Sequence, residues 1–298
     1  MRHFISRGRR GFTLAELLVT MVILGVIGAA LVRLILVQAR FSEGQMALRD
    51  ARSVSRNAMN IMLTDLRMVQ DYDGLTFASK DSVTVRMPIA FGLLCSTSPQ
   101  VTMSLVPVDS ALSSLGVYAG WAYRDSASGI YKYSVAANPA PINSIPNGLT
   151  TLCTDSVTGA GVLPITVGGR SSRMITVPDA PNGTPNAGWP VFIYQRVTYA
   201  FDSSKAFPGR IGLFRRLKSA TGSTVSDEIV APFDTSAKFR FYVLNEDTAQ
   251  SAVPASLNSV RGLQLVLAGA SVTVPRGSSQ AKQASLVTGV FFKNRRDP

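Results

Sequence analysis

Glu16 is the one charged residue in the 21-residue apolar run formed by residues 12–32. An acidic side chain inside a membrane helix costs a few kcal/mol on insertion scales, so it needs a partner or a function. Either Glu16 lies near the membrane interface and stays protonated or solvated, or it has such a partner or function.

The histidine and cysteine content argues against an enzyme. His3 is the only histidine and lies in the basic segment 1–11, so a chain processed after Gly11 would contain none. This disfavours Ser-His-Asp and Cys-His catalysis and removes the commonest metal ligand. Two cysteines cannot complete a four-ligand zinc site by themselves. We therefore predict no catalytic site, no metal site and no cofactor.

Residues 71–74 read Asp-Tyr-Asp-Gly, and the two carboxylates could offer oxygens to calcium. They fall far short of an EF-hand loop, so turn formation explains the segment better. The glycine pair Gly168-Gly169 lacks the spacing of a phosphate-binding loop.

Arg49, Arg52 and Arg56 recur at helical spacing and share one helix face. They could meet acidic lipid headgroups, a partner's carboxylates or nucleic-acid phosphates, or form a solvated face partly paired with Glu43 and Asp50. The basic residues of the chain are dispersed, without the aromatic interleaving typical of single-strand binding. Nucleic acid is therefore a weakly supported partner.

Residues 12–37 predict a membrane-spanning helix, since a span needs about 20 apolar residues at about 1.5 Å each. Four arginines and no acidic residue lie within residues 1–10. By the positive-inside rule the N-terminus lies in the cytoplasm and the rest of the chain lies across the inner membrane. Loss of residues 1–11 would lower the net charge from +12 to +8.

Residues 38–70 predict an amphipathic continuation of the same helix. The segment contains no proline, Gly44 is its expected weak point, and the turn at 71–74 ends it. Apolar residues recur at three- and four-residue spacing, which indicates a face that packs on a domain. That face consists of Val54, Ala58, Ile61, Met62, Leu66 and Val69.

Residues 71–298 predict a β-rich globular head. Short β-rich runs alternate with Gly-, Pro-, Ser- and Asn-rich clusters, as in antiparallel sheets. The expected strands are residues 82–87, 101–106, 118–123, 130–135, 174–177, 191–201, 211–217, 238–244, 262–268 and 286–292, with loops at 138–148 and 179–190. The predicted fold class is therefore α+β, a long N-terminal helix packed on an antiparallel sheet.

The sequence Gly11-Phe12-Thr13-Leu14-Ala15-Glu16-Leu17 resembles the class III signal of type IV pilins and type II secretion pseudopilins. In that family a basic leader ends in Gly, the mature chain starts with Phe or Met, and Glu occupies mature position five. The resemblance implies a pilin-like fold, cleavage between Gly11 and Phe12 by a prepilin peptidase, and N-methylation of Phe12. It also implies that Glu16 faces the N-terminal ammonium of a neighbouring subunit in a filament, while Gly25 and Gly28 permit close helix packing or are ordinary membrane-helix glycines.

The C-terminal third is similar to the W-type minor pilins and the J-type minor pseudopilins. In those families a strand ending in Tyr is followed by a Leu-x-Arg hairpin partner and a terminal strand that closes on Arg-Asn or a similar pair. The matching segments here are residues 196–201, 213–217, 228–233, 238–242, 260–267 and 290–295. This resemblance implies a minor subunit near a filament tip, with other minor and major pilins, the inner-membrane assembly platform and membrane lipid as partners. An adhesive or DNA-binding head displayed on the filament is the alternative.

Cys95 and Cys153 lie 58 residues apart in the part of the chain expected outside the cytoplasm. A disulfide is permitted there and would stabilise a loop-rich region by about 2–4 kcal/mol. Two free or buried thiols remain the other interpretation.

Overall fold

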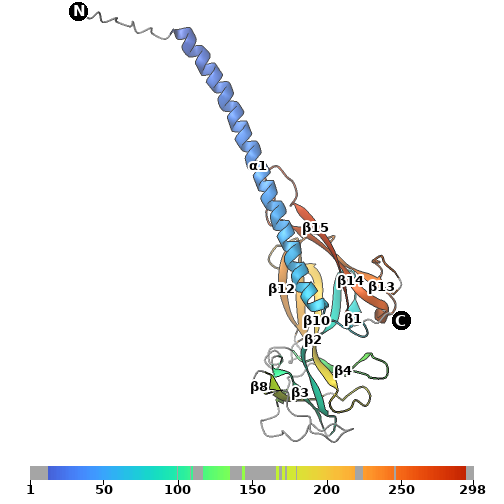
Figure 1. Cartoon of the computed structure of the whole chain (residues 1–298). Coiled ribbons are helices and arrows are strands. Elements are labelled where there is room, and N and C mark those ends of the chain that lie inside the picture. The colour runs from blue at the N-terminus through green and yellow to red at the C-terminus, as the bar shows by residue number, and fades with distance from the viewer. Residues whose placement is uncertain are drawn as a thin grey trace, which may run out of the picture.

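The computed structural model describes residues 13–98, 100–107, 109, 117–134, 143–144, 166–167, 170–171, 173–178, 180–218, 224–244 and 246–292. One helix, α1 (Leu14–Leu66), extends far beyond a β-rich head, which encloses only the last part of the helix (Figure 1). The architecture is α+β, as predicted from the sequence.

α1 runs without interruption for 53 residues, through Gly25, Gly28 and Gly44. Its sequence explains this length, because it contains no proline and is rich in strong helix formers such as Ala, Leu, Met and Arg. At about 1.5 Å per residue the helix is about 80 Å long. It ends four residues before the predicted limit of residue 70, and Val69 is buried in the turn that follows.

The head consists of fifteen strands and one short 3₁₀ turn among the described residues. The strands are β1 (Leu75–Ala78), β2 (Ser82–Ser96), β3 (Val101–Leu105), β4 (Gly120–Arg124), β5 (Tyr131–Tyr133), β6 (Asn143–Ser144), β7 (Thr166–Val167), β8 (Arg170–Ser171), β9 (Arg173–Val177), β10 (Pro190–Ser203), β11 (Ile211–Lys218), β12 (Thr224–Phe233), β13 (Lys238–Val243), β14 (Val260–Ala270) and β15 (Gln283–Phe291), with η1 (Leu257–Ser259) before β14.

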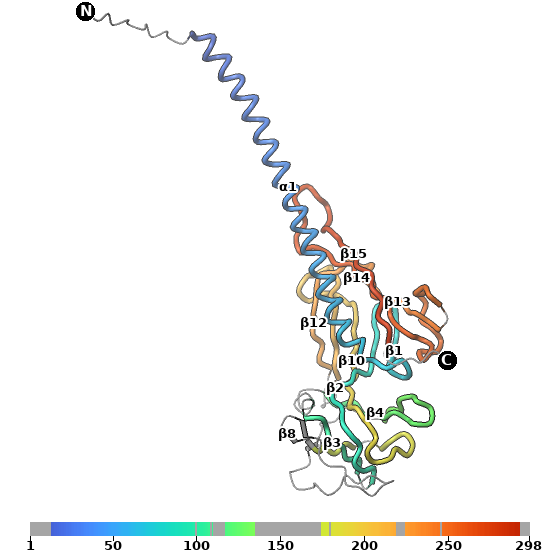
Figure 2. Tube along the Cα trace, in the orientation of Figure 1, coloured from blue at the N-terminus to red at the C-terminus, as the bar shows by residue number. Residues whose placement is uncertain are grey.

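Thirteen of these strands form one sheet with the main order β13-β14-β12-β11-β10-β2-β3-β9-β6. β1 pairs with β2, β4 with β10 and β5, and β15 with β14, while β7 and β8 form a separate pair. All described pairings are antiparallel. β2 and β10 are the longest strands, and they connect the part of the head around α1 to the part beyond the end of the helix (Figure 2).

Strand β2 is longer than the sequence predicted, because it continues past Pro88 to Ser96. Proline cannot donate a ladder hydrogen bond and is tolerated within a sheet at an edge or a bulge. The register between β2 and β10 shifts between Ile193 and Tyr194, where their partners are Ala90 and Pro88. The bulge therefore accommodates the proline that ended the predicted strand. The sequence did not predict the short strands β1, β6, β7 and β8 or the partly exposed, charge-containing β12, and β6 lies in the segment 138–148 that was predicted as a loop.

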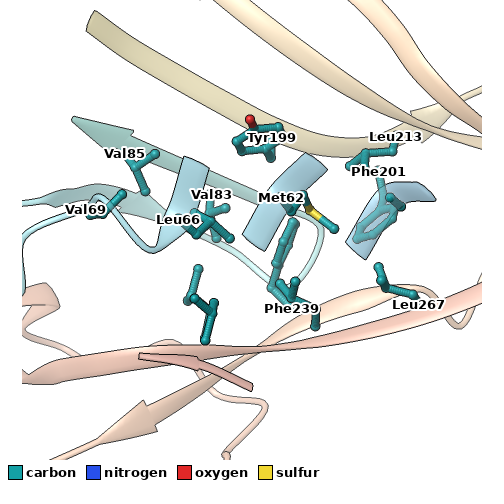
Figure 3. Packing of buried hydrophobic residues seen from close by; sticks show 14 of the residues in the cluster. Met62, Leu66, Val69, Val83, Val85, Tyr199, Phe201, Leu213, Phe239 and Leu267 are labelled. Carbon is teal, nitrogen blue, oxygen red and sulfur yellow. The ribbon is translucent and has the colours of Figure 1, made fainter. Parts of the chain in front are cut away.

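The C-terminal part of α1 is buried in the larger of the head's cores. Met62 and Leu66 lie between β10 and β11 on one side and β13 and β14 on the other (Figure 3). The buried partners include Val83, Val85, Tyr199, Phe201, Leu213, Phe239 and Leu267. Ile61 was predicted on the buried face, but it is exposed because the sheet covers a narrower stripe of the helix.

Small residues bring α1 close to β14. Ala47, Ala51, Ser55 and Ala58 follow one another at three- or four-residue spacing, and all are buried. The Ser55 hydroxyl accepts the Gly269 N–H at 3.0 Å and lies 3.1 Å from Leu267 O and 3.0 Å from Ala284 O. A Cβ on Gly269 would lie 2.5 Å from Ser55 Oγ and nearer still to Ala51 O. Helix and sheet therefore meet almost backbone to backbone at this point.

Candidate functional site

The N-terminus of α1 is capped by Thr13 and Glu16. The Glu16 N–H donates to Thr13 Oγ1 at 3.2 Å, and Glu16 Oε2 accepts the Thr13 N–H at 3.0 Å and the Thr13 hydroxyl at 3.1 Å. This reciprocal capping box satisfies donors that a helix start otherwise leaves unpaired. The carboxylate predicted to pair with a cation is thus held over the first turn, next to the predicted new N-terminus.

Residues 13–42 are exposed at every position, although the sequence of this segment is almost entirely apolar. Leu14, Leu24 and Phe41 are 83%, 67% and 69% exposed. Within the described part of the chain, α1 is the one helix long and apolar enough to cross a membrane. Such a surface is not stable in water, so this half of α1 requires lipid or other protein as its surroundings.

The end of α1 is fastened to the head by polar contacts as well as by the core. The Tyr199 hydroxyl on β10 donates to the carboxylate of Asp65, and Arg215 on β11 lies 3.6 Å from the same carboxylate. Burial, followed by the charge of Asp65, raises the pKa of Tyr199 above its ordinary value, so the phenol stays a donor. Sequence reasoning missed this cluster, since nothing in local spacing links residues so far apart.

The basic face of α1 lies toward solvent, with Arg49, Arg52 and Arg56 all exposed. Glu43, which was considered as one of their partners, instead pairs with Arg276 of the β14–β15 loop, at 3.8 Å between Arg276 Nε and Glu43 Oε1.

Residues 71–74 form the turn predicted from their sequence. Asp73 adopts a left-handed conformation with φ of 56°, its N–H donates to Asn258 Oδ1, and its carbonyl accepts from Arg86. The described residues hold no group of three or more His, Cys, Asp or Glu side chains that could bind a metal ion.

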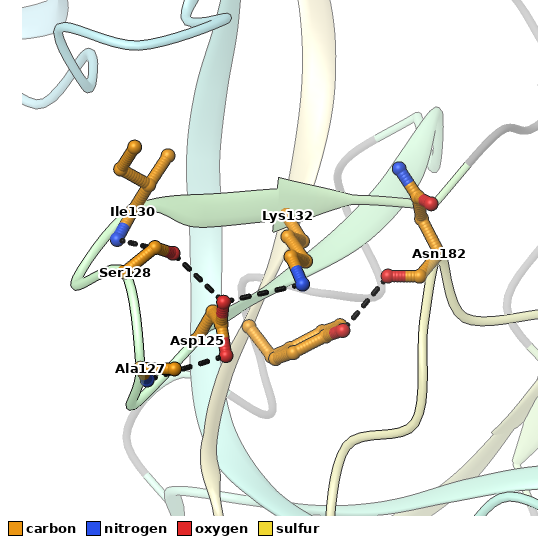
Figure 4. A network of polar contacts seen from close by, with 7 residues as sticks. Asp125, Ala127, Ser128, Ile130, Lys132 and Asn182 are labelled. Atoms are coloured by element: carbon orange, nitrogen blue, oxygen red, sulfur yellow. Dashed lines mark hydrogen bonds and ion pairs between the residues drawn. The ribbon is translucent and has the colours of Figure 1, made fainter.

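A cavity of about 740 Å³ lies between this turn and the β4–β5 hairpin. Its lining includes Tyr72, Arg124, Tyr131 and Trp189. The hairpin turn is organised by Asp125, which accepts from Ser128 Oγ at 2.7 Å and pairs with Lys132 at 3.2 Å (Figure 4). The hydrogen bond from Ser128, and then that from Lys132, lowers the pKa of Asp125.

Three predicted site residues, Gly11, Phe12 and Cys153, lie outside the described part of the chain. Cys95 on β2 is buried and disulfide-bonded. Its pairing with Cys153 in particular stays a prediction.

The N-terminal segment matches a known family of sequences. Residues 6–32 match the model of the prokaryotic N-terminal methylation motif. The match includes the predicted cleavage point, Phe12 and Glu16, and it ends within the exposed half of α1. The chain thus resembles type IV pilins and pseudopilins in its signal. Searches of curated proteins and of solved structures found no match.

Proposed function

We propose that the chain is a minor pilin, a structural subunit that a prepilin peptidase cuts between Gly11 and Phe12 and that enters the tip region of a type IV pilus. One observation carries the proposal. The methylation motif runs into a continuous helix whose first half is apolar and wholly exposed while its second half is packed into a head. The exposed half of such a helix can leave the lipid and pack against the corresponding helices of neighbouring subunits.

Glu16 would act when the helix leaves the lipid and packs against neighbouring subunits. Cleavage would place a new, methylated ammonium on Phe12, one residue before the Thr13 cap. An opposite charge in a low-dielectric filament core offsets the desolvation of both groups, whereas an unpaired carboxylate there is expensive. The capping box holds the Glu16 carboxylate at the helix end, where the ammonium of a neighbouring subunit can reach it.

The N-terminus of the mature protein tests this proposal. Intact-mass analysis of membrane and sheared-surface fractions should find a chain that starts at methylated Phe12 in both. The Gly11→Leu variant should keep residue 1 and stay in the membrane fraction. A mature mass in Gly11→Leu would refute the cleavage assignment, and a wild-type chain starting at Met1 in membranes alone would indicate an ordinary anchored protein.

A minor subunit of a type II secretion pseudopilus is the alternative within the same mechanism. The C-terminal resemblance fits both machines. Deleting the chain should lower the number of surface pili if it primes pilus assembly, and should instead block export of secreted enzymes if it serves secretion.

A displayed binding head is the second candidate, and the cavity beside the β4–β5 hairpin favours it. The cavity combines exposed aromatic surface at Tyr72 with the Arg124 guanidinium, and it lies beyond the end of α1. If binding is the main task, Tyr72→Ala with Arg124→Ala should abolish adhesion or DNA capture while leaving pilus number unchanged. Loss of pili in that variant would instead indicate an assembly role for this face.

A further inference from the structure

The loop between β14 and β15, residues 271–282, extends along α1 toward the exposed half of the helix (Figure 1). Two contacts hold it there. The Arg276 N–H donates to Glu43 Oε2 at 3.2 Å, and Arg276 Nε lies 3.8 Å from Glu43 Oε1. Pro275 is buried beside them. The loop therefore has a defined height along the helix, at the level of Glu43.

Exposed apolar groups and cations occur together at this height. Val274 of the loop is 46% exposed, and Phe41 of α1 is 69% exposed. A groove of about 300 Å³ between helix and loop is lined by Arg40, Phe41, Arg276 and Lys282, among others. The loop contains no acidic residue. Apolar side chains with interspersed cations are the composition of surfaces that bind the membrane interface.

The length of the span places Arg40 and Phe41 among the headgroups and the loop just outside them. The apolar part of α1 ends at Val37, and its only cation, Arg33, lies close enough to that end to extend toward the interface. Glu43 lies six residues beyond Val37, which is about 9 Å along the axis. Headgroup regions add about 5–7 Å to each side of the hydrocarbon core. A small tilt of α1 would bring the loop into contact with lipid.

We propose that residues 271–282, together with Arg40 and Phe41, form a lipid-contact surface for anionic phospholipid headgroups. This surface seats the head on the outer face of the membrane before the chain enters a filament. The inference rests on the proposed function only in taking α1 as the span and the head as exported. Arg40, Arg276 and Lys282 attract the phosphates, and Val274 and Phe41 enter the interface.

The test uses the full chain reconstituted in vesicles, with a tryptophan at the surface in Val274→Trp. The matched control is Val253→Trp, which is 42% exposed in the wild type and lies five residues before Asn258, whose side chain accepts from Asp73 in the turn after α1. Vesicles of phosphatidylcholine, with and without phosphatidylglycerol, contain brominated lipid as quencher. Wild-type fluorescence from Trp121 and Trp189 is subtracted.

Quenching at position 274 should be at least twofold greater than at 253, and it should rise when phosphatidylglycerol is included. Equal quenching at the two positions in vesicles that carry the inserted chain would overturn the lipid-contact surface while leaving the membrane span and the proposed function intact. Quenching that does not change when phosphatidylglycerol is included would overturn the headgroup assignment. Protection of position 274 only after filament subunits are added would show a protein contact in place of lipid.

The cations provide a second test. The double substitution Arg276→Gln with Lys282→Gln is introduced into the Val274→Trp variant. It should remove the dependence of the quenching at position 274 on phosphatidylglycerol. Arg196→Gln with Lys218→Gln removes the same charge from exposed positions on β10 and β11, on the part of the head remote from the span, and should leave the dependence unchanged. The same loss in both double variants would mean that net charge, and not this surface, governs the contact.

Discussion

The two halves of α1 are made from the same strong helix formers but have opposite surroundings. Residues 13–42 are exposed on every side and apolar nearly throughout, whereas the half that follows buries a stripe of Ala47, Ala51, Ser55, Ala58, Met62 and Leu66 against the sheet. The packed half needs only one apolar stripe because its other faces meet solvent. The first half is largely apolar on all its faces, and the described residues of the head bury no part of it.

This contrast assigns each half a different energetic task. The packed half contributes to the stability of the head through core burial and the contacts of Ser55 and Asp65. The exposed half contributes to association with lipid or neighbouring subunits. Substitutions in the two halves should therefore separate stability from assembly.

Met62→Ala should produce the largest loss of stability. Met62 is fully buried, so truncation removes apolar burial and leaves a cavity, at a cost of about 2–5 kcal/mol. Urea titration of the full chain in detergent, followed by tryptophan fluorescence and circular dichroism, measures the free energy of unfolding. Met21→Ala makes the same chemical change in the exposed half and should leave that free energy unaltered. Equal losses in both variants would contradict the division of α1.

Gly269→Ala should follow, with a loss of about 1–3 kcal/mol in the same titration, because the added methyl overpacks the contact with α1. The new Cβ would lie 2.5 Å from Ser55 Oγ. Gly44→Ala is the matched control, since nothing lies within 4 Å of a Cβ at that position. In a helix interior it should be neutral or stabilise by up to about 1 kcal/mol. A Gly269→Ala head as stable as wild type would mean that helix and sheet can separate freely.

Ser55→Ala should cost about 1–3 kcal/mol, because it leaves the buried Gly269 N–H without its acceptor. Ser53→Ala, two residues away on an exposed position, controls for helix propensity and should change the free energy of unfolding by less than about 0.5 kcal/mol. If the two variants had the same free energy of unfolding, the Ser55 hydroxyl contact would contribute nothing to stability.

The sequence sufficed for the helix, the β-rich head and the N-terminal signal because each rests on local pattern. It failed where tertiary contacts decide. Ile61 fits the apolar period but lies outside the stripe that the sheet covers, while Ala47, Ala51 and Ser55 are buried because β14 approaches so closely. The repeated small residues were a visible signal of this approach. Pro88 hid the second half of β2, since a bulge cannot be read from composition.

Glu16→Ala should have the smallest effect on the stability of the head and a large effect on assembly. The variant loses the carboxylate side of the capping box, and the resulting fraying stays within the first turns of α1, at the end of the helix that lies far from the head (Figure 1). The free energy of unfolding should therefore change by less than about 0.5 kcal/mol. Cleavage after Gly11 should continue, while the amount of the chain in the sheared-surface fraction should fall severalfold.

Glu16→Gln makes this comparison sharper. The amide oxygen can still accept the Thr13 N–H, so the cap is largely kept while the negative charge is lost. If charge pairing with a neighbouring ammonium drives incorporation, Glu16→Gln should resemble Glu16→Ala in the sheared fraction. Normal incorporation of Glu16→Gln would show that the carboxylate matters as a helix cap alone. Normal incorporation of both variants would remove Glu16 from the assembly mechanism.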